Sequence, residues 1–196
     1  MRIYTRKGDD GTTALLFGHR TTKSSSRIEL NGAIDEAQAA LGLARAEAEV
    51  GSQLDEMLID LERSLYRVMA DVATEAEQRD RLPSGESAVD QPMVDALESS
   101  IDRLSALFKT PREFVIPGSN RRSATLDLAR TIIRRAERIA VGGAAEGLVV
   151  PYLNRLSDLL WVMARWQEQA PLPARVRPRR DERDAQRQSG SSGKPN

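Results

Sequence analysis

The sequence predicts an all-α fold, an up-and-down bundle of five helices in a single domain. Apolar residues recur at alternating steps of three and four in five separate stretches, the spacing of amphipathic helices. The alternation typical of strands is nearly absent. Because the connections are short, consecutive helices should run antiparallel. With 196 residues, of which 40% are hydrophobic, the chain can bury one core.

The first three helices are placed by their apolar stripes. The first stripe is Leu30, Ile34, Ala37, Leu41, Ala44 and Ala48, the second Leu54, Leu58, Leu61, Leu65, Val68 and Val72, and the third Val94, Leu97, Ile101, Leu104 and Phe108. A loop at 79–92 precedes the third helix, and its residues Pro83, Gly85 and Pro92 exclude a continuous helix. The steps of three and four indicate packing within a bundle.

The fourth and fifth helices are expected over 119–141 and 152–166. They are separated by a break that contains Gly142, Gly143, Gly147 and Pro151. After residue 170 the composition changes, since 171–196 holds four prolines, six arginines, one lysine and three acidic residues. The sequence therefore predicts a helical domain over 1–170 and a disordered, proline- and arginine-rich tail over 171–196.

Charge and composition exclude several function classes. The 29 basic and 29 acidic residues balance, so no chain-wide field attracts nucleic acid or an anionic membrane. The absence of cysteine excludes disulfides, thiolate metal sites and a cysteine nucleophile. The N-terminus lacks the apolar region of a signal peptide, and no stretch is long enough to span a bilayer. We expect a soluble, cytoplasmic protein that acts on small molecules.

The stretch TRKGDDGTTALLFG at 5–18 has the residue types of a phosphate-binding loop without the spacing of a P-loop. Glycine lets backbone N–H groups turn toward an anion, while threonines add hydroxyl donors and the basic residues add charge. The residues concerned are Gly8 and Gly11, Thr5, Thr12 and Thr13, and Arg6, Lys7 and Lys23. The stretch indicates a triphosphate site; the alternative is an ordinary Gly-Asp turn.

The fourth helix carries a concentration of charge on one face. Its residues Asp127, Arg130, Arg134 and Glu137 are spaced by three, four and three, with Arg138 beside them and Arg135 more to the side. In a bundle, such a stripe requires anionic partners or solvent. Asn154 and Asp158 lie one turn apart on the fifth helix and are expected to be polar partners for part of this stripe. The alternative is a solvated surface with weak intrahelical ion pairs.

The single histidine and the two tryptophans are interpreted from their positions in the sequence. His19, the only histidine, is interpreted as an exposed loop residue, and a single histidine excludes a di-iron bundle, which needs two Glu-x-x-His pairs. Trp161 and Trp166 are interpreted as core and subunit-interface packing.

Four motifs in this order resemble the PduO-type ATP:cob(I)alamin adenosyltransferases over about residues 1 to 168. They are IYTRKGDDGTT, RIELNGAIDE, FVIPGSNRRSATLDLARTIIRRAER and YLNRLSDLLWVMAR. The resemblance implies the family's ferritin-like five-helix bundle, assembled as a homotrimer with ATP between neighbouring subunits. It also implies the reaction, in which the cobalt(I) of a reduced corrinoid attacks the 5′-carbon of ATP to give adenosylcobalamin and triphosphate.

The resemblance assigns roles to individual residues. The ATP-binding residues that it implies are Thr5, Arg6, Lys7, Gly8, Thr13 and Lys23 around the phosphates, and Arg134, Arg135, Glu137, Arg138 and Asn154 on the last two helices. It matches Asp35 and Arg130 to an intersubunit ion pair that borders the corrinoid. It matches Phe114 to the aromatic that displaces the corrinoid's lower ligand. The catalytic set implied is thus Arg130, Arg134, Phe114 and Asp35, with Mg²⁺ held through the ATP phosphates.

The chain departs from the family pattern at three places. It has Gly118-Ser119 where two glycines are common, Leu126-Asp127 where Leu-His is common, and DEAQAALG on the first helix where Asp-Glu-Leu-Asn is usual. The acid at Asp127 is expected to alter the charge beside Arg130. Activity is still expected, with a cobalt reductase and an adenosylcobalamin-dependent mutase as partners. The alternative is a non-catalytic module that binds and delivers the corrinoid to that mutase.

Overall fold

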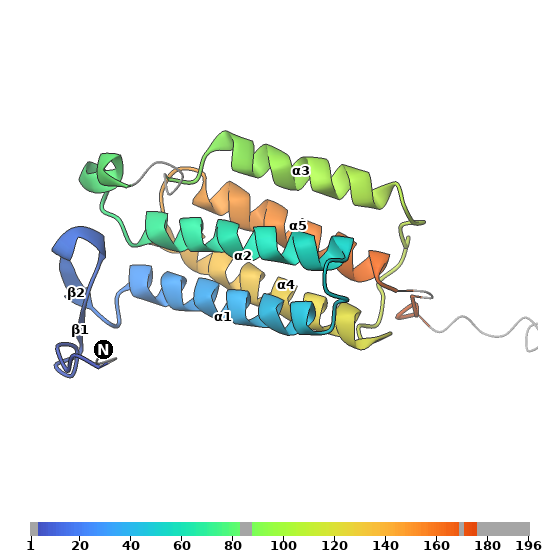
Figure 1. The fold of residues 1–196 in the computed structure, drawn as a ribbon, viewed down its shortest axis with the longest axis horizontal. Helices are drawn as coiled ribbons and strands as arrows, with labels where there is room; N and C mark the ends of the chain where they lie inside the picture. The colour runs from blue at the N-terminus through green and yellow to red at the C-terminus, as the bar shows by residue number, and fades with distance from the viewer. Residues whose placement is uncertain (1–3, 83–87, 169–170, 176–196) are drawn as a thin grey trace, which may run out of the picture.

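Five α-helices form an up-and-down bundle in the computed structural model, which describes residues 4–82, 88–168 and 171–175. They are α1 (Ser26–Ala46), α2 (Gln53–Val72), α3 (Gln91–Ser105), α4 (Arg121–Ile139) and α5 (Val149–Trp166). Each helix runs antiparallel to the one before it, as the colour gradient in Figure 1 shows. The all-α five-helix prediction is confirmed.

Polar caps explain where four of the helices begin. The side chains of Ser25, Ser52 and Asp90 accept hydrogen bonds from backbone N–H groups in the first turns of α1, α2 and α3. Asn120 and Ser123 form a reciprocal capping box at the start of α4. The fifth helix has no side-chain cap and starts three residues before the expected position, with Pro151 in its first turn. Proline is tolerated there because the first N–H groups of a helix have no intrahelical partner.

The core lies between the helices and is formed by the predicted stripes. Helix α1 packs against α2 and α4, α4 packs against α5, and α5 packs against α3. The stripe residues Leu30, Ile34, Leu58 and Leu65 are fully buried, as is Leu104 of α3. The third stripe is only partly confirmed, because α3 ends at Ser105 and its last predicted member lies in the following loop.

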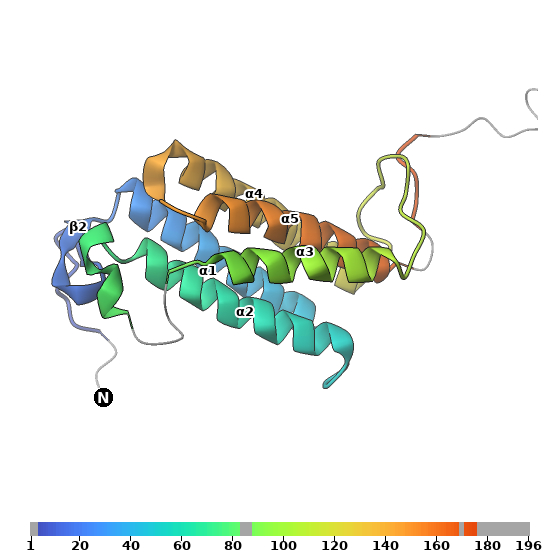
Figure 2. The ribbon, with the colours of Figure 1, turned by 90° about the horizontal axis from the view of Figure 1, so that it is seen from above.

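The two ends of the bundle carry different structures (Figures 1 and 2). One end holds an antiparallel hairpin of β1 (Thr12–Ala14) and β2 (Arg20–Thr22), the short helix η1 (Leu16–Gly18) between them, and the 3-10 helix η2 (Ala76–Arg81). The opposite end holds the loop that precedes α4. After α4 the chain makes a π-helical turn, η3 (Ala140–Ala144), in which Gly143 has φ = 92°. Glycine tolerates this left-handed backbone, which explains the break before α5.

The first residues of the predicted tail lie against the domain. Residues 171–175 run beside the loop before α4, where Val115 and Pro173 form an antiparallel bridge. The N–H of Ile116 donates to the carbonyl of Leu172 at 2.8 Å, and the N–H of Ala174 donates to the carbonyl of Phe114 at 2.7 Å. The remainder of the predicted tail, 176–196, lies outside the described residues. No helix in the described part of the chain combines the length and apolar character that crossing a lipid bilayer requires.

Candidate active site

The glycine-rich stretch folds into a loop that leads into the hairpin. Asp10 accepts hydrogen bonds from the backbone N–H of Thr12 at 2.9 Å and from its hydroxyl at 2.8 Å. These bonds lower the pKa of the Asp10 carboxyl, with a smaller contribution from Arg20. The guanidinium of Arg20 also donates to the carbonyl of Lys7 at 2.9 Å and to the Thr12 hydroxyl. Arg20 therefore ties the two sides of the loop together, a role that the sequence did not reveal.

Glycine is required at two positions of this loop for different reasons. A Cβ on Gly8 would lie 3.0 Å from the carbonyl oxygen of Thr12 and 3.2 Å from Nζ of Lys23. Gly11 has φ = 83°, a conformation that other residues adopt rarely. The close approach at Gly8 places the Lys23 ammonium directly against the loop backbone. This juxtaposition of a cation with a glycine backbone suits an anion.

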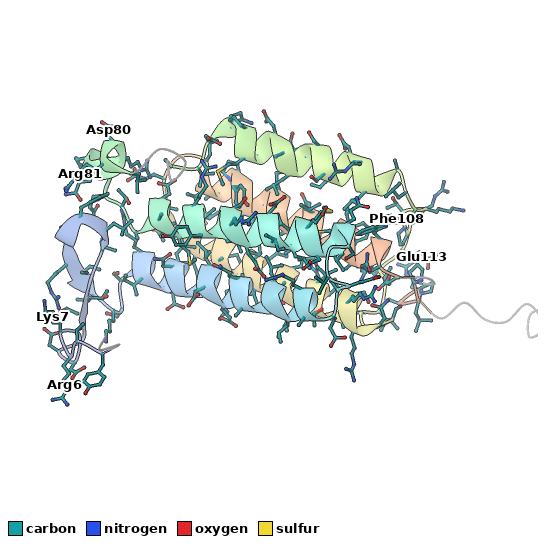
Figure 3. All side chains as sticks on the ribbon, viewed as in Figure 1. Arg6, Lys7, Asp80, Arg81, Phe108 and Glu113 are labelled. Carbon is teal, nitrogen blue, oxygen red and sulfur yellow. The ribbon has the colours of Figure 1, made fainter. Side chains whose placement is uncertain are left out.

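The basic residues of the loop point into solvent. Arg6, Lys7 and Lys23 are exposed, and Figure 3 shows Arg6 and Lys7 at the outer edge of the hairpin end. No carboxylate in the described part of the chain forms an ion pair with any of the three. Their charge is therefore available to a ligand.

The charged face of α4 divides into residues with and without partners. Arg135 is paired with Glu36 of α1. Glu137 accepts a hydrogen bond from Nδ2 of Asn154 at 2.8 Å, so these two predicted nucleotide contacts adjoin across α4 and α5. Arg138 donates to the backbone carbonyl of Arg134 at 3.2 Å. Within the described ranges the exposed Arg134 side chain has no partner, which leaves its guanidinium free.

A cleft of about 700 Å³ opens at the other end of the bundle. Phe114 lies on its rim with 90% of its surface exposed, so this side chain does not plug the bundle's end. Trp161 also lines the cleft, while part of its ring packs on the core. The remaining lining residues are Pro111, Arg112, Glu113, Val115, Pro117, Asp127, Arg130, Arg165, Ala174 and Arg175. The cleft thus brings Phe114 and Arg130 together, as the resemblance implied.

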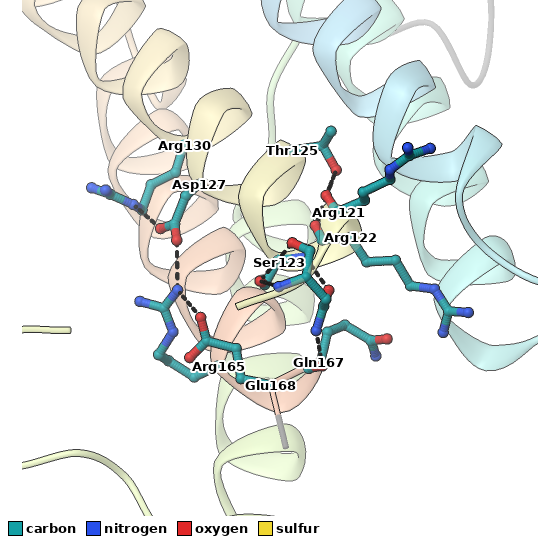
Figure 4. A network of polar contacts seen from close by, with 10 residues as sticks. Arg121, Arg122, Ser123, Thr125, Asp127, Arg130, Arg165, Gln167 and Glu168 are labelled. Carbon is teal, nitrogen blue, oxygen red and sulfur yellow. Dashed lines mark hydrogen bonds and ion pairs between the residues drawn. The ribbon is translucent and has the colours of Figure 1, made fainter. Parts of the chain in front are cut away.

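Behind this cleft lies a buried ion network that the sequence did not predict (Figure 4). Asp127 accepts from Nε of Arg130 at 3.1 Å and from Nη2 of Arg165 at 2.5 Å. The same Nη2 of Arg165 donates to Glu168 at 2.9 Å. Burial raises the pKa of the Glu168 carboxyl, while Arg165 opposes the shift. The anionic partner of Arg130 within the chain is therefore Asp127 of its own helix, and Asp158 of α5 is exposed instead.

The remaining predicted residues are placed as follows. Asp35 is exposed on α1 and has no ion pair in the described part of the chain, so its assignment to an intersubunit pair stays a prediction. His19 is exposed in the hairpin, with Nε2 3.8 Å from a carboxylate oxygen of Glu75. Among the described residues, no group of three or more His, Cys, Asp or Glu side chains could hold a metal ion.

Comparison with known proteins finds related proteins along most of the chain. The profile of the cobalamin adenosyltransferase family matches residues 3–167. A corrinoid adenosyltransferase of Mycobacterium tuberculosis is 40% identical over 170 residues, covering 84% of this chain and 87% of the relative. One from Citrobacter freundii is 39% identical over 177 residues, covering 87% and 97% respectively.

A solved structure gives the same result for the fold. It is a phenylalanine-to-alanine variant of a PduO-type ATP:corrinoid adenosyltransferase from Lactobacillus reuteri, complexed with cobalamin and ATP. It superposes with a TM-score of 0.79 at 29% identity, covering 89% of this chain and 100% of that one. Since the family profile spans nearly the whole helical domain and these relatives align along most of their length, the chain belongs to the cobalamin adenosyltransferase family.

Proposed function

We propose that this chain transfers the 5′-deoxyadenosyl group of ATP to the cobalt of cob(I)alamin, forming adenosylcobalamin and releasing triphosphate. The main observation in support is the position of the cleft. Phe114 and Arg130 line it, and Arg130 lies one helical turn from Arg134, whose guanidinium is unpaired in the described ranges. A corrinoid in the cleft would therefore adjoin a nucleotide on the charged face of α4.

The ATP site is assigned to two groups of residues. The loop supplies Thr5, Arg6, Lys7, Gly8, Thr13 and Lys23, and the helices supply Arg134, Arg135, Glu137, Arg138 and Asn154. The unpaired cations of the loop support a role in binding phosphate, because charge-assisted hydrogen bonds to phosphate are strong. The Asn154–Glu137 hydrogen bond holds both side chains in fixed positions, which supports a role in orienting the nucleoside.

The corrinoid site is assigned to Phe114, Arg130 and Asp35. The exposed ring of Phe114 would pack on the lower face of the corrin and take the place of the lower ligand. The resulting four-coordinate cobalt(II) is easier to reduce. Arg130 borders the same cleft and would pair with Asp35 of a neighbouring subunit.

The separation of the loop from the cleft supports a site shared between subunits. Figure 3 places Arg6 and Lys7 at one end of the bundle, and Phe108 and Glu113, which precede Phe114, at the other. Helix α4 has 19 residues and is thus about 28 Å long. Because reacting atoms must approach within about 3–3.5 Å, the loop of one subunit would serve the cleft of its neighbour.

The surface of α1 and α4 is the proposed interface. It exposes two large apolar side chains, Leu43 at 56% on α1 and Leu128 at 48% on α4, and α1 also carries the exposed Asp35. Exposed apolar side chains rimmed by polar residues are typical of interaction surfaces. We infer the homotrimer implied by the resemblance, since a heterologous contact that closes on itself forms a ring.

The chemistry requires positioning and charge stabilisation rather than a general base. Cobalt(I) donates its electron pair to C5′, the C5′–O bond breaks, and triphosphate leaves with the bonding electrons, so cobalt ends as alkylcobalt(III). Arg134 and the loop cations would meet the charge that develops on the leaving group. Among the described residues, no group of three or more His, Cys, Asp or Glu side chains could hold the metal ion by itself. Mg²⁺ would therefore be held by the phosphates and would neutralise part of their charge.

Anaerobic turnover tests the proposal directly. Chemically reduced cobalamin and Mg-ATP are mixed with the full chain, and the absorbance change to adenosylcobalamin is followed together with triphosphate release. Stoichiometric formation of both products over many turnovers is the expected result. Tight binding of adenosylcobalamin without turnover would instead favour the corrinoid-delivery module. In the cell, a cobalt reductase would supply cob(I)alamin and an adenosylcobalamin-dependent mutase would receive the product, and the use of ATP favours a cytoplasmic location.

A further inference from the structure

The buried side chains behind the cleft form a continuous chain of contacts that ends at a proposed corrinoid residue. Asp127 and Arg165 are each 4% exposed, and Glu168 is 9% exposed. Nη2 of Arg165 is shared between the two carboxylates, at 2.5 Å from Asp127 Oδ2 and 2.9 Å from Glu168 Oε1. Figure 4 shows Arg165 reaching from the end of α5 to the carboxylate on α4. The bond therefore connects the two helices that frame the cleft.

The second carboxylate oxygen of Asp127 faces the cleft side. Oδ1 accepts from Nε of Arg130 at 3.1 Å, so the two oxygens of one carboxylate bind two different guanidinium groups. Arg130 uses only its Nε in this contact, and its Nη groups have no partner among the residues of the described ranges. A guanidinium has five N–H donors, so most of its donors stay available to a ligand in the cleft.

The balance of charge explains why both arginines are needed. A carboxylate as deeply buried as that of Asp127 requires a cation, because an uncompensated buried charge is strongly destabilising. Arg165 satisfies this requirement from within the protein. Without it, the nearest cation is Arg130, which would be drawn fully onto the carboxylate and away from the cleft.

We propose that Arg165 is a positioning residue for the corrinoid, which acts by holding Asp127 so that Asp127 fixes Arg130 through Nε alone. The proposal rests on the assignment of the Phe114 cleft to the corrinoid. Arg165 borders the cleft, but its side chain is only 3% exposed and therefore offers little surface for direct contact with the substrate. Its effect should therefore be confined to the corrinoid and should pass through Arg130.

Arg165→Lys tests this role with the charge retained. A lysine ammonium is a point charge without the planar fork of arginine, so it cannot hold both carboxylates in the same geometry. We expect the KM for cob(I)alamin to rise about tenfold, in the range of coupling between contacting residues, while the KM for ATP changes less than about twofold. The four-coordinate cobalt(II) signal formed with ATP should weaken in parallel.

The matched control is Arg45→Lys. Arg45 pairs at 3.0 Å with Asp55, a carboxylate that is 6% exposed, and it does not line the cleft. The same chemical change there should leave the KM for both substrates unaltered. If Arg165→Lys does not fold, Asp127→Asn is measured in its place. The amide oxygen can still accept a hydrogen bond from Arg130, but the side chain no longer attracts Arg130 as an anion. The same rise in the KM for cob(I)alamin, without a rise in the KM for ATP, is expected.

A double-mutant cycle separates positioning from a general loss of structure. If Arg165 acts through Arg130, Arg165→Lys should have no further effect on the KM for cob(I)alamin in the Arg130→Ala background. Additive effects, an unchanged corrinoid KM, or an equal rise in the KM for ATP would each overturn the proposal. Turnover by the unsubstituted chain is measured first, since its absence would refute the proposed function itself and not the role of Arg165.

Discussion

Removal of the Arg134 side chain should abolish most catalysis without disturbing the fold. The guanidinium is exposed and has no partner in the described ranges, so Arg134→Ala breaks no internal contact. The bond that Arg138 makes is to the backbone carbonyl of Arg134 and survives the substitution. An exposed substitution of this kind changes the free energy of unfolding by less than about 0.5 kcal/mol. The melting temperature should therefore stay close to that of the unsubstituted chain.

The expected loss of activity follows from the negative charge on the triphosphate leaving group, which Arg134 is proposed to stabilise. Removing one preorganised donor from a developing oxyanion costs about 2.7–4 kcal/mol, or about 10²–10³ in kcat. Because the contact strengthens as the leaving group departs, kcat should fall more than the KM for ATP rises. The assay is anaerobic adenosylation at saturating ATP and cob(I)alamin.

Arg63→Ala is the control for this measurement. Arg63 is an exposed arginine on α2 that pairs with Asp60 of its own helix at 3.5 Å, and it neither lines the cleft nor lies on the proposed interface of α1 and α4. Its replacement should leave kcat unchanged. A kcat for Arg134→Ala within about threefold of the control, in a correctly assembled protein, would refute the role assigned to Arg134.

Three further predictions concern the cleft and its supporting network. Phe114→Ala should retain the melting temperature, since the ring is 90% exposed, and should retain ATP affinity, while optical and paramagnetic spectra lose the four-coordinate cobalt(II) signal. Persistence of that signal would remove Phe114 from the mechanism. Arg130→Ala should weaken corrinoid binding or the trimer in titration and sedimentation experiments, and Asp35→Ala should add no further loss in that background if the two residues pair across subunits. Finally, the raised pKa of Glu168 means that the folded chain binds this proton more tightly than the unfolded chain, so the free energy of unfolding falls as pH rises above about 4.5. Glu168→Gln should remove this decline, and urea unfolding curves at several pH values would contradict the assignment if both proteins lost stability in parallel.

The helices could be predicted because their stripes are long and regular. All six predicted stripe residues of α2, from Leu54 to Val72, are buried, and the helix begins directly after its cap at Ser52. The start of α5 was harder to place, since Pro151 signals a break when read alone, whereas its end at Trp166 was predicted correctly. The position of Pro151 in the first turn of α5 depends on the π-helical turn before the helix, which no local sequence pattern predicted.

The site was predictable only where residues close in sequence share a role. Asp127 and Arg134 project from α4 only about 20° apart, yet Asp127 is buried and Arg134 is exposed. Asp127 is buried because Arg165 at the end of α5 reaches its carboxylate and also binds Glu168, whereas Arg134 has no such partner in the described ranges. The contact between Asp127 and Arg165 joins residues 38 positions apart. Arg165 stands within the apolar run of α5, and no local pattern in the sequence identified Asp127 as its partner.

The pairing of residues 171–175 with the Phe114 loop has a consequence for the order in which the protein is built. A polypeptide is synthesised from its N-terminus, so all five helices emerge before this segment does. The bundle can then pack, and become stable, while the cleft still lacks the wall that Ala174 and Arg175 provide. Stability of the fold and completion of the proposed corrinoid cleft are thus separate events during synthesis, and a chain that ends after α5 is expected to fold without completing the cleft.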